Sequence, residues 1–239
     1  VINLLWLLCS LPFVILLMVH IWLLASQPEP AANLYTLITV MLPPLATVPF
    51  TLFPASAAMF SVARKWIMGD GDIPLFRSYF RYFKENYKSS MIAGLFFVLM
   101  LIVILVNLQF YTDMGSWLSA LRILFLVFVF ILLASSVNFL NFVSHFEMGT
   151  WALIRNSIFF TVGRPLTSIY LLVTNFAILY ISIAQFQFLI PFFMGSFMAI
   201  VSFWGFYRVV NKLREKEAEK MRMAEEESAG EGAESGSGI

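Results

Sequence analysis

The chain has 239 residues, of which 60% are apolar, 17% aromatic and 12% charged. Because a soluble globular domain carries about 25% charged residues, this composition excludes a water-soluble fold and predicts an all-α bundle of membrane-spanning helices. One cysteine, two histidines and a net charge of +1 exclude an internal disulfide and an all-cysteine metal site, and they point to no nucleic-acid partner.

The first expected span covers residues 2–25, with Asn3, Ser10 and His20 as its polar interruptions. Its apolar stretch exceeds the roughly 7–15 residues of a signal peptide, and it lacks a basic leader, so we interpret it as a membrane span. The chain begins with Val1 rather than methionine, and residues before it are therefore expected.

The second expected span, 34–62, contains four prolines, at positions 43, 44, 49 and 54. Each proline removes a helical donor, so we expect a bent or broken element, with a short piece to Leu42 and a main span from Leu45. The small residues of 55–61 suit either a discontinuous helix at a binding site or close helix packing, and we favour packing.

Four further spans are expected at 91–111, 118–143, 166–184 and 188–207. The link between the last two is short, which predicts a tight antiparallel pair. A loop over 63–90 follows the second span, and residues 212–239 form a charged tail. We expect the tail to be helical over 213–226 and disordered from Ser228.

The basic residues predict the orientation of these six spans. Fourteen of the 15 lie after the second, fourth and sixth spans, and the exception is Arg122. Because basic loops stay in the cytoplasm, both termini are expected there. The fourteen are Arg64, Lys65, Arg77, Arg81, Lys84, Lys88, Arg155, Arg164, Arg208, Lys212, Arg214, Lys216, Lys220 and Arg222.

The cytoplasmic stretch Asp72–Lys88 is predicted to be an amphipathic helix on the membrane surface. Aromatic residues recur in it at i, i+4, i+7 and i+11, and basic residues follow each of them by one position. The stripes favour packing on the protein's own spans, contact with anionic lipid headgroups, or docking to a partner protein. We call this set the basic aromatic face: Phe76, Arg77, Phe80, Arg81, Phe83, Lys84, Tyr87 and Lys88.

A second candidate set is the polar stripe inside the fourth span: Ser135, Asn138, Asn141 and His145. Polar groups at this depth usually hydrogen-bond between helices, and a gate or ligand contact is the alternative. Asp and Glu are absent from the middle of every expected span, which argues against an ion-coupled transporter. No nucleophile elbow, metal motif or cofactor fingerprint occurs, so no enzyme and no cofactor are expected.

Several blocks of the sequence resemble the YesL-type family of bacterial integral membrane proteins, a domain of unknown function. They are Asn3–Pro12, Pro54–Phe60, Arg64–Trp66 with Gly69–Asp70, and Phe80–Lys88. The resemblance implies a multi-pass protein of the bacterial cytoplasmic membrane. It also implies an association with sugar-uptake ABC transporters, beside whose components such proteins are often encoded.

The expected function is therefore an accessory or regulatory subunit of a bacterial carbohydrate ABC transporter. Its expected partners are the lipid bilayer, permease subunits and a second copy of the chain. A stand-alone carrier or channel for a small neutral solute such as a sugar is the alternative, and a membrane-embedded enzyme or lipid-handling protein is a third interpretation.

Overall fold

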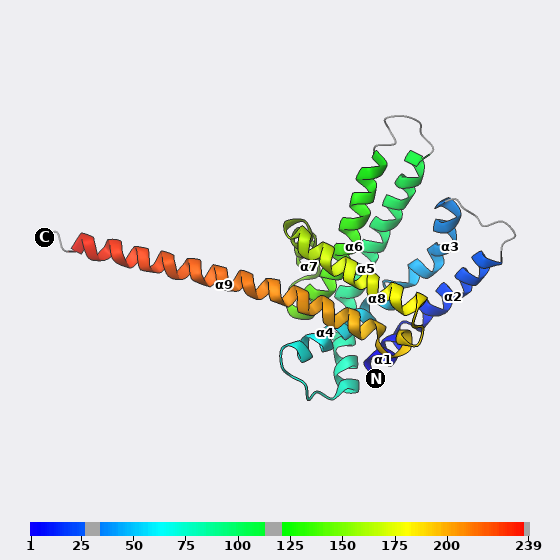
Figure 1. The fold of residues 1–239 in the computed structure, drawn as a ribbon, viewed down its shortest axis with the longest axis horizontal. Helices are drawn as coiled ribbons and strands as arrows, with labels where there is room; N and C mark the ends of the chain where they lie inside the picture. Colours follow the sequence, from blue (N-terminus) through cyan, green and yellow to red (C-terminus); the bar gives the residue numbers. More distant parts are fainter. Residues whose placement is uncertain (27–33, 113–120, 237–239) are drawn as a thin grey trace.

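The computed structural model describes residues 1–26, 34–112 and 121–236 (Figure 1). Every regular element in these ranges is a helix, which confirms the all-α prediction for this part of the chain. Four helices are long and apolar enough to cross a membrane, and there are six candidate spans if each of two bent helix pairs counts as one.

The first of these bent pairs replaces the single span expected over 2–25. Helices α1 (Ile2–Cys9) and α2 (Leu11–Ala25) meet at an angle of 69°. Pro12, in the first turn of α2, has no N–H to donate to the carbonyl four residues earlier, and the Ser10 hydroxyl donates to the Trp6 carbonyl at 2.6 Å. Pro12 was therefore the sequence signal for the bend.

The second bent pair is the expected broken element, but the break lies further along the chain. Helices α3 (Leu34–Thr47) and α4 (Leu52–Ile67) meet at 48°, so the expected break near residues 43–44 is wrong and both prolines there lie inside α3. At the actual break the Thr51 hydroxyl donates to the Thr47 carbonyl at 2.8 Å, which satisfies a carbonyl at the end of α3.

The expected surface helix and the third span form one continuous helix, α5 (Leu75–Thr112). The interfacial helix is therefore not a separate element, because the serines that join the two stretches, Ser89 and Ser90, do not break a helix. In Figure 1 α5 pairs with α6 (Leu121–His145) in a long hairpin.

The stretch between α6 and the fifth span, expected to be a loop, contains helix α7 (Thr150–Gly163). Helix α8 (Pro165–Ala184) follows and lies against the last helix, α9 (Gly195–Gly236), which a π-helical turn, η2 (Ile190–Met194), precedes. Helix α9 continues the sixth span far beyond the bundle in Figure 1. It includes part of the tail that the sequence predicts to be disordered.

Helix α4 is the centre of the bundle and contacts α1, α5, α6 and α9. Its small residues Ala55, Ala57 and Ala58 have no exposed surface, which supports the close-packing interpretation of this segment. Phenylalanines from α5, α6 and α9 form a buried cluster beside it: Phe97, Phe139, Phe142, Phe203 and Phe206.

Asn3, the first polar interruption of the sequence, connects the N-terminal helix α1 to the turn η2 and the start of α9. Its side chain is 1% exposed, its Nδ2 donates to the Ile190 carbonyl at 2.7 Å, and its Oδ1 accepts from the Ser196 N–H at 2.9 Å. The irregular turn η2 leaves backbone groups without their usual helical partners, and this amide satisfies two of them.

Tyr79 joins α5 to α4 in the same way, and its hydroxyl donates to the Ala55 carbonyl at 3.0 Å in a fully buried position. Removing the hydroxyl in Tyr79→Phe is expected to cost about 1 kcal/mol, which lowers the unfolding temperature in mild detergent by about 2–4 °C. Intrinsic tryptophan fluorescence measures this, and Tyr180→Phe at a 60% exposed position is the matched control. Equal unfolding temperatures for the two variants would contradict the prediction.

Candidate functional site

The polar stripe of α6 faces the other helices of the bundle. Ser135, Asn138 and Asn141 have no exposed surface, and His145 is partly buried at the end of the helix. The structure therefore brings the four predicted residues together on one face, as their helical spacing requires.

Asn138 and Ser135 hold α6 against α7 and α8. Asn138 Nδ2 donates to Thr161 Oγ1 at 2.9 Å and to Ser168 Oγ at 3.2 Å. Ser135 Oγ donates to the same Thr161 oxygen at 3.1 Å, and Thr161 donates to the Ser157 carbonyl at 2.8 Å. These contacts support the structural interpretation of this half of the stripe.

Sequence reasoning missed Thr161 and Ser168 because their helices meet at a turn, and no periodic pattern connects them. The available signal was a polar pair, Ser157 and Thr161, at i and i+4 in a stretch taken for a loop.

The stripe ends in a group of cations at His145. Arg214 of α9 places Nη2 3.4 Å from His145 Nε2, and Arg64 of α4 donates from Nη1 to the Ser144 carbonyl at 3.1 Å. Arginine only donates, so His145 must accept at Nε2 in this contact. Glu147, two residues further along the chain, is exposed and makes no ion pair with the described residues.

The part of the chain that the structure describes contains no group of side chains suited to binding a metal ion. No three His, Cys, Asp or Glu side chains gather there closely enough to hold a metal ion. Cys9, the one cysteine of the chain, is partly buried in α1.

The basic aromatic face occupies the first half of α5, and its cations are exposed to solvent. Phe76 is 62% exposed and its ring centroid lies 5.0 Å from that of Phe80. Arg81 is engaged within the protein, because Nη2 donates to the Tyr82 hydroxyl at 3.0 Å and Nε lies 3.7 Å from Glu85. The face therefore combines one exposed ring, Phe76, beside the partly buried Phe80 with mostly unpaired cations.

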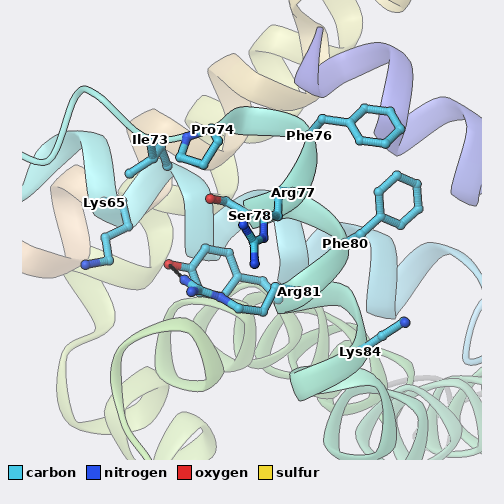
Figure 2. A pocket seen from close by; sticks show the side chains of 10 residues that line it. Lys65, Ile73, Pro74, Phe76, Arg77, Ser78, Phe80, Arg81 and Lys84 are labelled. Atoms are coloured by element: carbon cyan, nitrogen blue, oxygen red, sulfur yellow. Dashed lines mark hydrogen bonds between the residues drawn. The ribbon is translucent and has the colours of Figure 1, made fainter.

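A cavity of about 780 Å³ opens on this face between α5 and the end of α4 (Figure 2). Figure 2 shows Phe76 and Phe80 on one side of α5, with Lys65 of α4 on the other side. Three predicted residues do not line the cavity: Phe83, Tyr87 and Lys88. The lining is Lys65, Ile73, Pro74, Phe76, Arg77, Ser78, Phe80, Arg81, Tyr82 and Lys84.

The turn that carries the chain from α4 to this face is fixed by one ion pair and one glycine. Lys65 Nζ lies 2.7 Å from Asp70 Oδ2, and this ammonium holds the pKa of the Asp70 carboxyl below its usual range. Gly69 adopts φ 97°, a left-handed conformation that side chains rarely accept. Lys65, Gly69 and Asp70 all lie in the blocks that resemble the YesL-type family.

Comparison with known proteins agrees with those blocks. Residues 1–108 match the family described as "Protein of unknown function, DUF624". The chain is 30% identical to "Uncharacterized protein YesL" of Bacillus subtilis (strain 168) over 176 residues, which cover 71% of this chain and 81% of the relative.

Two further relatives come from the same organism. "Uncharacterized protein YteU" is 23% identical over 72% of this chain and 78% of its own length, and "Uncharacterized protein YesV" is 27% identical over 66% and 76%. No solved structure matches the chain. The chain is thus a helical membrane protein that belongs to the YesL-type family, DUF624, a family of unknown function.

Proposed function

We propose that this membrane protein is an accessory or regulatory subunit of a carbohydrate ABC importer in the bacterial cytoplasmic membrane. We further propose that the basic aromatic face is the surface that docks on the permease. The observation that carries the proposal is the combination, on the first half of α5, of the exposed Phe76 ring beside the partly buried Phe80, unpaired cations and an open cavity.

The charges of this face favour a protein partner. Arg77, Lys84 and Lys88 are exposed, and none lies within 4.0 Å of a carboxylate among the described residues. Exposed aromatic residues beside arginine are typical of interface centres, and unpaired cations steer a negatively charged partner into register.

The interior of the bundle favours a subunit over an ion-coupled carrier. The expected spans contain no carboxylate in their middle. The stripe residues Ser135 and Asn138 donate hydrogen bonds to neighbouring helices. Coupled transport usually requires titratable groups at that depth. The resemblance to a family encoded beside sugar importers supplies the class of partner.

The first test is purification of the tagged chain from native membranes in mild detergent, with mass spectrometry of the proteins that accompany it. Two permease subunits of an ABC importer in fixed proportion are the expected result. Elution alone or as a homo-oligomer would contradict the proposal. Uptake of a sugar by liposomes that contain this chain alone would instead favour the carrier.

The second test removes the free cations of the face in Arg77→Gln/Lys84→Gln/Lys88→Gln. Loss of three exposed ion pairs, at about 0.2–1 kcal/mol each, is expected to reduce the recovered permease about threefold or more. The control is Arg155→Gln/Lys220→Gln/Arg222→Gln, which removes the same charge from α7 and α9. Equal recovery by both variants would exclude this face as the docking surface.

A further inference from the structure

A small basic cleft lies between the start of α8 and the middle of α9, away from the basic aromatic face. Its volume is about 360 Å³, and its lining contains four cations and no acid. Three of the cations recur every four residues and so share one side of α9. The lining residues are Arg164, Thr167, Arg208, Val209, Lys212, Leu213 and Lys216.

These cations have no counter-charge among the side chains that the structure describes. None of the four makes an ion pair there. Arg208 instead lies over an aromatic ring, with its guanidinium carbon 4.6 Å from the centre of the Trp204 ring. Like charges gathered in a small volume repel one another, so a bound anion stabilises this arrangement.

The first turn of α8 adds a hydrogen-bond donor to the cleft. Helix α8 begins at Pro165 without a side-chain cap, so the N–H of Thr167, which lines the cleft, has no partner inside the helix. The positive end of the helix dipole also lies here. The cleft therefore offers both cations and a backbone donor to a phosphate group.

The basic cleft continues into an apolar groove on the same side of α8 and α9. The groove has a volume of about 540 Å³ and shares Thr167, Arg208 and Val209 with the cleft. Its other lining residues are Leu166, Tyr170, Trp204 and Gly205. Leu166 is 82% exposed, and Tyr170 and Trp204 are each 45% exposed, so the groove presents uncovered apolar surface.

Gly205 explains how the groove stays open while the two helices remain close. A Cβ atom at this position would lie 3.0 Å from Leu171 Cδ2 and 3.2 Å from Tyr170 Cε1. The missing side chain lets α8 and α9 approach, and it leaves a shallow floor between the Tyr170 and Trp204 rings.

We propose that the basic cleft and the apolar groove together bind one anionic phospholipid. The phosphate lies among the four cations, and an acyl chain follows the groove past Tyr170 and Trp204. Charge complementarity selects an anion, and the continuous apolar groove selects a lipid over a soluble phosphate. Both helices are long and apolar enough to cross a membrane, and basic pockets between such helices suit lipid headgroups.

The test uses the full-length purified chain in detergent, stripped of native lipid and titrated with a short-chain phosphatidylglycerol. Native mass spectrometry counts the bound lipids. One phosphatidylglycerol is expected to bind at least tenfold more tightly than phosphatidylcholine with the same acyl chains. Equal affinity for the two lipids would overturn the proposal, because phosphatidylcholine carries no net charge.

Paired variants separate the site from general attraction to a basic surface. Arg208→Gln/Lys212→Gln is expected to weaken phosphatidylglycerol binding tenfold or more. Lys220→Gln/Arg222→Gln removes the same charge from α9 outside the cleft and is expected to retain wild-type affinity. An equal loss in both variants would show that only the overall charge matters and would overturn the proposal.

A third variant addresses the acyl chain and a soluble ligand. Trp204→Ala is expected to weaken phosphatidylglycerol binding severalfold, whereas Trp151→Ala, at a 67% exposed position on α7, leaves it unchanged. Inorganic phosphate at millimolar concentration is expected not to displace the lipid. Displacement by phosphate, or no effect of Trp204→Ala, would assign the cleft to a soluble anion instead.

Discussion

Replacing Gly94 with valine is expected to lower the stability of the bundle by about 3 kcal/mol. A Cβ atom at this position of α5 would lie 2.9 Å from the Pro49 Cα and 3.0 Å from Phe53 Cγ. Pro49 belongs to the break between α3 and α4, so the obstacle is backbone and cannot rotate away. The valine therefore has to push α5 away from that break.

The measurement is thermal unfolding in mild detergent, where a fall of about 6–12 °C is expected for Gly94→Val. Gly163→Val is the matched control, because a side chain at the last residue of α7 meets nothing within 4 Å. If both variants unfold at the same temperature, the close approach of α5 to the break does not stabilise the fold.

Asn138→Asp is expected to have an effect of similar size through electrostatics. The carboxylate has the shape of the amide, but it cannot donate to Thr161 and Ser168 as Asn138 Nδ2 does. The position has no exposed surface and lies within a candidate span, where a charge costs about 2.5–3.5 kcal/mol. Most of this loss is expected at pH 8.

Acidic conditions are expected to restore part of the stability of Asn138→Asp, since a protonated carboxyl is neutral and donates one hydrogen bond. The comparison is the unfolding temperature at pH 8 and pH 5, relative to the wild-type chain at each pH. Asn156→Asp, on α7 near the basic end of the bundle, is the control and is expected to show little change. A wild-type unfolding temperature for Asn138→Asp at pH 8 would contradict a structural role for the stripe.

The class of fold can be predicted from the sequence, because this class depends on local composition. Long apolar runs require helices in a membrane, and the amides of the stripe repeat with the period of one helix. Bends are harder to place, because a proline inside a helix costs less where neighbouring groups take over its hydrogen bonds. Pro43 and Pro44 lie inside α3, whereas Pro12, in a run taken for one span, accompanies a bend.

The sites formed between helices depend on packing that no local pattern contains. Arg164 and Lys212 are read from the sequence as cytoplasmic charges of a loop and of the C-terminal tail. Only the pairing of α8 with α9 brings them to one cleft. The continuous helix α5 could not be predicted for a similar reason. The sequence of an amphipathic stretch has the same pattern whether it forms a separate surface helix or continues into a span.

The length of α9 has a mechanical consequence. Residues beyond Lys216 continue as helix to Gly236, and at about 1.5 Å per residue they extend roughly 30 Å from the bundle (Figure 1). A rod of that length works as a lever arm: a tilt of about 10° at its base displaces its tip by roughly 5 Å. A small change in the tilt of α9 relative to the other spans would thus displace its C-terminal end by several ångströms.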